Sequence, residues 1–259
     1  MLSKPPSITI KSSNEIALMI KAGKILAKVL EELSKFCQPG ITTDEINTQA
    51  DYLIRTQGAL PGFFGYNGFP KSICISVNNE VVHGIPGPRI IQDGDLVSLD
   101  CGAVYEGLWA DSGLTVGVGE VSVEARKLLV ITQQALYAGI RAARAGNRIG
   151  DISASIQSYV EKSGFSVVRD LVGHGIGRAM HEPPQVPNFG QINTGPILKE
   201  GYGLAIEPMV NQGTHKVKTL KDGWTVVTED GKLSAYFEHT VLVTEGEPIV
   251  TTLRNDEIL

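Results

Sequence analysis

The chain has 259 residues, of which 42% are hydrophobic and 20% charged, and a formal net charge of −5. This is the composition of a globular domain, and the acidic balance excludes a nucleic-acid surface, which needs a clustered basic excess. No apolar run reaches the ~18–20 residues of a membrane span, and the first residues contain no signal-peptide stretch. Cys37, Cys74 and Cys101 share no metal-type spacing, which indicates free thiols in a reducing compartment. We therefore expect a cytoplasmic protein with no membrane or direct nucleic-acid partner.

The first half of the chain is predicted to form two helices followed by strands. Ser12 and Glu15 form a capping-box pattern, and apolar residues at helical spacing behind them predict a helix to about Phe36. A second helix is expected from about Thr43 to Gln57. Strand-like sequence follows at Ser72–Val77, Leu96–Ala103 and Leu108–Val116.

The same order then begins again. Ser122 opens a helix whose apolar face runs to Ala143, and a shorter helix is expected from about Gly150 to Ser163. Strand-like segments follow at Gly203–Glu207, Thr225–Thr228 and Ser234–Val243.

A constant offset of 106 residues relates the two halves. It joins three positions at equivalent places in the helix pairs, Gly40, Ile46 and Gly58, to Gly146, Ile152 and Gly164. We interpret this as an internal duplication within one catalytic domain, residues 1–259, with halves of about 12–120 and 121–250. Two such α+β halves are expected to pack face to face and to leave a cleft where they meet.

The segment LVSLDCGAVYEGLWADSG contains two aspartates on two strand-like runs. A two-residue turn at Tyr105 and Glu106 would place Asp100 directly opposite Asp111, with Cβ atoms only ~4.5–5.5 Å apart. Two carboxylates that close favour a cation between them. Since Tyr-Glu is not a favoured type I′ pair, a different register with one solvated aspartate is the alternative.

The segment LVGHGIGRAMHEPPQVPN contains two of the five histidines, His174 and His181. Their glycine- and proline-rich surroundings indicate irregular backbone, which excludes a helical ligand pair of the H-E-x-x-H kind, and the spacing does not fit a nucleotide-binding loop. A lone histidine is usually a core or surface residue, but two in such a setting favour a functional pair.

Two glutamates occur in otherwise apolar strand-like segments. Glu207 ends the run GLAIEPMV before Pro208, and Glu238 lies inside LSAYFEHTVLVT. Acidic residues rarely occupy such runs unless they are paired or bind metal, although either could be an edge-strand charge facing solvent.

Together these segments supply four carboxylates and one imidazole: Asp100, Asp111, His174, Glu207 and Glu238. Oxygen-rich ligation with one nitrogen suits Mn, Fe(II), Co or Zn, and differs from the cysteine-rich sites of structural zinc. Four carboxylates are too many for one divalent ion but fit two ions ~3.5–4 Å apart.

These residues, in this order and spacing, resemble the methionine aminopeptidases of the short bacterial type (type I, peptidase family M24). The resemblance extends from SITIKSSNEI to LSAYFEHTVLVTEG. It implies an α+β pita-bread fold, with two pseudo-symmetric helix–helix–strand halves around an antiparallel sheet. It also implies metal-dependent removal of the initiator methionine from nascent proteins and peptides, with a preference for a small second residue.

The resemblance also implies roles for individual residues. The metal ligands are the five residues above, Glu207 transfers the proton, His181 donates to the developing oxyanion, and His83 positions the peptide. The methionine pocket is formed by Tyr66, Phe69, Cys74, Met180 and Trp224. We expect two divalent ions (Co, Mn, Fe(II) or Zn) and a structural monovalent cation, Na or K, near Asn78 and Ser234. The expected partners are nascent polypeptide N-termini at the ribosome, and the expected state is a monomer.

One segment departs from the family pattern, and two alternatives remain open. The family commonly has aromatic-His-Gly where this chain has Leu108, Trp109 and Ala110, which bears on metal preference or cleft shape. Proline-directed enzymes of the same fold have a further histidine where this chain has Arg178, and a longer N-terminal region. A non-catalytic binding module of this fold would have lost metal ligands, and this chain retains all five.

Overall fold

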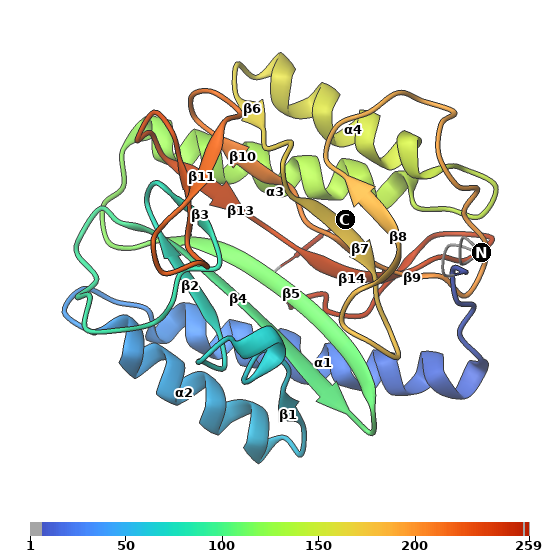
Figure 1. Ribbon diagram of the computed structural model, residues 1–259, viewed down its shortest axis with the longest axis horizontal. Helices are drawn as coiled ribbons and strands as arrows, with labels where there is room; N and C mark the ends of the chain where they lie inside the picture. Colours follow the sequence, from blue (N-terminus) through green and yellow to red (C-terminus); the bar gives the residue numbers. More distant parts are fainter. Residues whose placement is uncertain (1–6, 256, 259) are drawn as a thin grey trace.

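The computed structural model describes residues 7–255, 257 and 258, and its helices follow the predicted order closely. The helices are α1 (Ser13–Phe36), α2 (Thr43–Thr56), α3 (Val123–Ala142) and α4 (Ile149–Lys162). Figure 1 shows α1 and α2 on one side of the curved strands and α3 and α4 on the other. The predicted capping box of α1 is confirmed, because Ser12 accepts from the backbone N–H of Glu15 while Glu15 accepts from that of Ser12.

The 106-residue offset recurs in the backbone of the two helix pairs. The matched glycines have similar left-handed φ values and the matched isoleucines are fully buried: Gly40 97° and Gly146 91°, Gly58 79° and Gly164 86°, Ile46 and Ile152. The residues that begin the second helix of each pair, Thr42 and Arg148, also form equivalent isolated bridges, to Ile90 and Ile197. Both halves therefore contain a helix pair with the same local backbone at the 106-residue offset, and the duplication within one domain remains a prediction.

The strands of the described residues form four hydrogen-bonded groups. One group contains β1 (Leu60–Pro61), β2 (Cys74–Val77), β4 (Leu96–Tyr105) and β5 (Leu108–Gly117), with a short 3-10 turn at Tyr66–Gly68 after β1. A second contains β8 (Glu182–Pro187), β7 (Val172–Gly175), β9 (Gly203–Ile206), β14 (His239–Leu242) and β15 (Ile249–Val250). The two smaller groups are β6 (Ser166–Val167), β10 (Met209–Asn211) and β13 (Ser234–Tyr236), and β3 (Glu80–Val82), β12 (Val226–Thr228) and β11 (Val217–Thr219).

Strand β5 joins the two halves through side chains as well as backbone. Thr240 Oγ1 accepts from the N–H of Asp111 and donates to its carbonyl, each at 2.8 Å. Thr115 Oγ1 makes the equivalent pair of bonds to Tyr236, at 2.8 and 2.7 Å. Between them, the backbones of Gly113 and Glu238 bridge directly. The central strands of both halves therefore form one continuous antiparallel surface.

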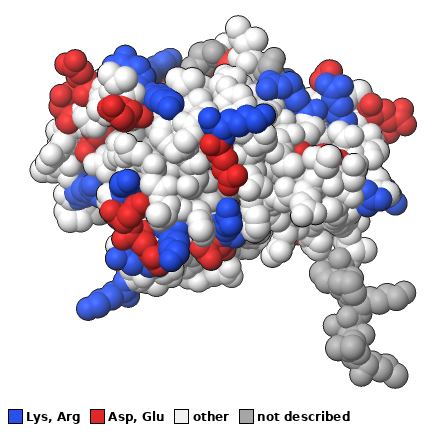
Figure 2. Space-filling view, turned by 90° about the horizontal axis from the view of Figure 1, so that it is seen from above, with Lys and Arg blue, Asp and Glu red and all other residues white. Residues whose placement is uncertain are grey.

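Helices α1 and α3 pack against this surface and complete the core. Helix α1 contacts β4 and β5, whereas α3 contacts β13, β10 and β5. Their apolar faces are fully buried, as expected from the helical spacing in the sequence, at Leu26, Leu30, Leu128 and Leu136. None of the helices in the described part of the chain is long and apolar enough to cross a membrane. The face seen in Figure 2 has Lys and Arg side chains interspersed with Asp and Glu.

Candidate active site and metal centre

The register predicted for the β4–β5 hairpin is wrong by two residues. The two turn residues are Glu106 and Gly107, with φ of 47° and 81°, so Tyr105 pairs with Leu108. A type I′ turn needs left-handed backbone at both positions, which glycine adopts and the expected Tyr-Glu pair disfavours. Asp100 therefore lies opposite Gly113 and Asp111 opposite Gly102. The aspartates are diagonal neighbours on one face and not directly opposed.

Each aspartate faces a glycine, and an aromatic ring covers each glycine. A Cβ on Gly113 would lie 2.2 Å from the ring of Tyr236, and one on Gly102 would lie 2.9 Å from the ring of Phe63. Neither position can therefore hold a larger residue without displacing a ring. The arrangement leaves the space beside both carboxylates free of cross-strand side chains.

The two glutamates are the pair that is directly opposed. The register of β9 with β14 and of β10 with β13 places Glu207 opposite Glu238 across an interruption of the ladder. Pro208 has no N–H to donate at this point, so the predicted continuous strand Ser234–Val243 is broken at Phe237 and Glu238. Like charges directly opposite each other are destabilising, which favours a cation between these carboxylates.

His174 lies on strand β7, and not in irregular backbone as expected. Its glycine neighbours permit close strand packing, because a Cβ on Gly173 would lie 2.4 Å from Ala205 O and one on Gly175 would lie 2.2 Å from Pro183 O. The Nδ1 of His174 lies 2.9 Å from its neighbour's carbonyl, that of Gly175, so Nε2 is left to face Glu207, whose Oε1 is 3.5 Å away.

The site has the donor atoms that a cation requires. Asp111, His174 and Glu238 each offer a ligand atom within 4.8 Å of the others, and all three are buried. Asp100 Oδ1, Asp111 Oδ1 and Glu238 Oε1 are buried without a hydrogen-bond partner in residues 7–255, 257 and 258. Buried acceptors without partners are costly, and bound divalent cations would satisfy them. The residues present therefore fit a metal centre.

The pKa values of the four buried carboxyl groups are all raised. Burial raises the pKa of Asp111 to about 7. Burial and the neighbouring carboxylates raise the pKa values of Asp100, Glu207 and Glu238 well above their usual range. These shifts have the physical cause expected where negative charges are gathered out of water without their counter-ions.

Tyr236 is a site residue that the sequence interpretation missed. Its hydroxyl donates to Glu238 Oε2 at 2.5 Å, and its ring covers Gly113. The available signal was the alternation of a strand, since residues two apart point to the same face. Tyr236 and Glu238 keep this relation across the strand break.

A cavity of about 280 Å³ opens onto the carboxylate cluster. It is lined by all the predicted pocket and catalytic residues and by four of the five predicted ligands, the exception being the buried Glu238: Tyr66, Phe69, Cys74, His83, Asp100, Asp111, His174, Met180, His181, Glu207 and Trp224. Phe63 also lines it, together with residues that were not predicted as site residues, Asn67, Val82, Leu171, Val172, Met209 and Tyr236.

The other two predicted site histidines, His83 and His181, line the cavity and contact different aromatic residues. His181 stacks against Tyr66, with ring centroids 5.5 Å apart, and its ring is 4.2 Å from that of His174. His83 meets the edge of Trp224, with centroids 6.4 Å apart, and has left-handed backbone with φ 60°. Burial lowers the pKa of His83 to about 4 and also lowers that of His181, so both imidazoles are neutral donors near neutral pH.

The departure at Leu108, Trp109 and Ala110 leaves the cluster intact. The ring of Trp109 packs against that of Tyr66 in a T-shaped arrangement, with centroids 5.9 Å apart, and the backbone N–H of Trp109 donates to Gly177 O. Away from the cavity, the N–H of Ser234 donates to Asn78 O, and both side chains are hydrogen-bonded to protein groups. The monovalent cation expected there remains a prediction.

Comparisons with known proteins identify the family of the chain. The profile of Metallopeptidase family M24 matches residues 17–245. A methionine aminopeptidase of Clostridium perfringens is 55% identical over 95% of this chain and 99% of its own length. Methionine aminopeptidase 1 of Bacillus subtilis is 52% identical over 94% of this chain and 99% of its own.

Among solved structures, a methionine aminopeptidase from Thermotoga maritima superposes with a TM-score of 0.94. It is 44% identical and covers 95% of this chain and 99% of its own. The antiparallel strands with two repeated helix pairs are thus those of the pita-bread fold. The chain belongs to metallopeptidase family M24 and, within it, to the methionine aminopeptidases.

Proposed function

We propose that the protein removes the N-terminal methionine from nascent proteins and peptides by metal-dependent hydrolysis of the first peptide bond. The observation that carries this proposal is the set of buried, unpartnered carboxylate oxygens of Asp100, Asp111 and Glu238 at an aromatic-walled cavity. The family's metallopeptidase chemistry and the high identity to methionine aminopeptidases support it.

The proposed centre holds two divalent ions, of Co, Mn, Fe(II) or Zn. The diagonal placement of Asp100 and Asp111 and the opposed placement of Glu207 and Glu238 spread four carboxylates over more space than one ion occupies. His174 Nε2 provides the single nitrogen beside Glu207. When bound, the ions supply an activated water nucleophile and polarise the substrate carbonyl.

The chain's own residues bind and orient the substrate and move its protons. The side chain of Glu207 is 14% exposed, so it reaches the cavity. There it accepts a proton from the attacking water and passes it towards the leaving amine. His181 donates to the carbonyl oxygen as negative charge develops there, and His83 positions the peptide backbone. Both histidines are neutral donors for the reason given above.

The methionine side chain is proposed to occupy the aromatic end of the cavity. Phe69 meets Trp224 edge to face, with ring centroids 5.1 Å apart, and Cys74 and Met180 are buried beside them. Apolar walls with aromatic faces suit an unbranched thioether and exclude charged first residues, whose burial would be uncompensated. The peptide backbone must lie close to the carboxylates, which favours a small second residue.

We further propose that the protein is a cytoplasmic monomer that acts on nascent polypeptide N-termini at the ribosome. Its three cysteines are free thiols, which supports a reducing compartment.

The test measures release of methionine from Met-Ala-Ser and Met-Leu-Ser peptides. The protein is first stripped of metal with a chelator and is then supplied with each divalent metal in turn. We expect cleavage of Met-Ala-Ser with at least one metal and little cleavage of Met-Leu-Ser. Metal binding without turnover of either peptide would instead support a non-catalytic binding module. Preferential cleavage of Xaa-Pro peptides would support a proline-directed enzyme.

A further inference from the structure

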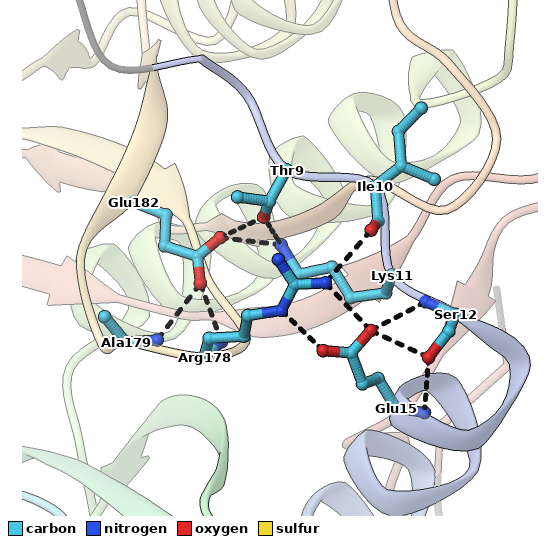
Figure 3. A network of polar contacts seen from close by, with 8 residues as sticks. All are labelled: Thr9, Ile10, Lys11, Ser12, Glu15, Arg178, Ala179 and Glu182. Atoms are coloured by element: carbon cyan, nitrogen blue, oxygen red, sulfur yellow. Dashed lines mark hydrogen bonds and ion pairs between the residues drawn. The ribbon is translucent and has the colours of Figure 1, made fainter.

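A buried ion pair lies behind the loop that carries Met180 and His181. Lys11 Nζ is 2.8 Å from Glu182 Oε2, and the two side chains are 1% and 7% exposed. Figure 3 shows this pair connected through Arg178 to Glu15 in the first turn of α1. Lys11 comes from the segment before α1, whereas Glu182 directly follows His181, so the pair links chain segments 171 residues apart. The function proposed above gives neither charge a chemical role.

In the described residues, the side chain of Glu182 is hydrogen-bonded only to this loop and to the N-terminal segment. Its Oε2 accepts from Lys11 Nζ and from Thr9 Oγ1 at 2.5 Å. Its Oε1 accepts from the backbone N–H groups of Arg178 and Ala179, at 2.6 and 3.0 Å. One carboxylate therefore closes residues 178–182 into a fixed loop and fastens that loop to Thr9 and Lys11.

A second connection runs from the same loop to α1. The guanidinium of Arg178 donates to both carboxylate oxygens of Glu15, at 2.5 and 3.0 Å, and Glu15 also caps α1 through Ser12. The loop also packs tightly against the side chain of Lys11, because a Cβ on Gly177 would lie 2.2 Å from Lys11 Cε. The N–H of Lys11 is itself bonded to Gly201 O at 2.9 Å, which fixes the lysine backbone on the other side.

We propose that the Lys11–Glu182 pair is a positioning device for His181 and Met180, which makes the segment before α1 a functional part of the active site. The proposal rests on the proposed function, in which His181 donates to the substrate carbonyl. The loop has its polar contacts with Lys11 and Glu182 on one side, and Met180 and His181 line the cavity on the other. Lys11 can affect the substrate only by holding the loop in place, and it is therefore a positioning residue.

The ion pair suits this task better than an apolar contact would. A buried pair is favourable only in a narrow range of geometries, because each charge must keep its partners to offset its lost hydration. A donor displaced by about 1 Å from the reacting oxygen can slow catalysis by about 100-fold. Loss of the pair should therefore impair the chemical step more than substrate binding.

The experiment compares Lys11→Met, Glu182→Gln and the double variant with the unmodified protein, all fully loaded with Zn²⁺. We expect kcat for Met-Ala-Ser to fall by about 10–100-fold while KM changes less than about threefold. Metal content should stay normal, because no proposed ligand is touched. The double variant should lose no more than the worse single variant, as expected for two residues that act as one unit.

Histidine NMR provides a measurement that is independent of turnover. In Zn²⁺-loaded protein with ¹⁵N-labelled histidine, the ring signals of His181, assigned from His181→Ala, should shift in Lys11→Met while those of His83 stay in place. Unchanged kcat and an unmoved His181 signal in folded Lys11→Met would overturn the proposal. If the unmodified protein cleaves no methionyl peptide, the proposed function fails, and the NMR comparison still decides whether the pair positions the ring.

A matched control removes an exposed ion pair whose residues do not line the cavity. Arg144 bonds to Glu247 at the surface, where their side chains are 42% and 75% exposed, so Arg144→Met should change neither kcat nor the His181 signal. A purely stabilising role of Lys11 would lower the melting temperature and leave kcat normal in the folded protein, which would also contradict the proposal. If Lys11→Met does not fold, the double variant, which has no unpaired buried charge, takes its place.

Discussion

The hydroxyl of Tyr66 lies 2.7 Å from Nδ1 of His181, and the two rings stack with centroids 5.5 Å apart. When the hydroxyl donates to Nδ1, the neutral imidazole carries its proton on Nε2. That nitrogen is then a hydrogen-bond donor for a substrate carbonyl. The ring of Trp109 packs against the same tyrosine, so the residue that departs from the family pattern supports this pair.

Replacing Tyr66 with Phe tests the pair, because it keeps the stacked ring and removes the hydroxyl. A neutral hydrogen bond contributes about 0.5–1.5 kcal/mol, so we expect kcat for Met-Ala-Ser to fall by roughly 2–13-fold. Metal content should be unchanged, as measured by atomic absorption. A normal kcat would mean that another contact fixes the tautomer of His181.

Replacing the two neighbouring histidines separates metal binding from catalysis. His174→Ala removes the nitrogen that faces Glu207, so we expect loss of bound metal together with activity. His181→Ala should retain metal and lower kcat by about 100–1000-fold, because it loses a donor used mainly in the transition state. Metal analysis of both purified proteins decides the matter. Equal loss of metal from both would make His181 a ligand.

The stability of the metal-free protein should fall as pH rises. Burial raises the pKa of Asp111 to about 7, so the folded state retains a proton that the unfolded chain releases near pH ~4. The stability linked to this group is therefore fully present below about pH 4 and is lost as pH rises through about 7. Asp100, Glu207 and Glu238 shift in the same direction.

Urea denaturation near about pH 5 and about pH 8, with a chelator and with Zn²⁺, measures this effect. We expect the chelated protein to remain folded at both values but to be less stable at the higher one, and the loaded protein to vary much less. Asp111→Asn should reduce the pH dependence of the chelated protein. If the free energy of unfolding changes equally with pH in the presence and absence of metal, the ions do not compensate the charges of these carboxylates.

Substrate preference tests the aromatic end of the cavity. Trp224 packs against Phe69 and His83, so Trp224→Ala should raise KM for methionyl peptides by roughly 10–100-fold. It should also narrow the preference for methionine over leucine at the first position. Peptides with Met, norleucine, Leu and Lys at that position measure the preference. If the unmodified protein cleaves Lys-Ala-Ser as readily as Met-Ala-Ser, the pocket assignment is wrong.

The helices and the residues of the site were predicted from the sequence more accurately than the pairing of the strands. Capping residues such as Ser12 act within one turn, so the start of a helix can be read from a few neighbours. The hairpin register depended on whether Tyr105 or Gly107 entered the turn, a choice governed by backbone conformation. The opposition of Glu207 and Glu238 depends on pairing between distant segments, which no local pattern contains.

The Lys11–Glu182 pair escaped prediction for a related reason. A lysine in a polar N-terminal segment is usually solvated, and its burial follows only from the docking of residues 9–11 against a loop from the other half. Tyr236 escaped because its importance depends on Gly113, from a strand of the first half, being small enough to admit its ring.

The length of the exposed two-residue turn at Glu106 and Gly107 determines which face of β5 carries Asp111. Side chains alternate between the faces of a strand, so one residue inserted or deleted in this turn would turn Asp111 to the opposite face if the pairing of β5 followed the new turn. Loop tips are ordinarily where chains tolerate changes of length. Here the length of the turn should be as strictly constrained as the aspartates themselves, although neither turn residue lines the cavity.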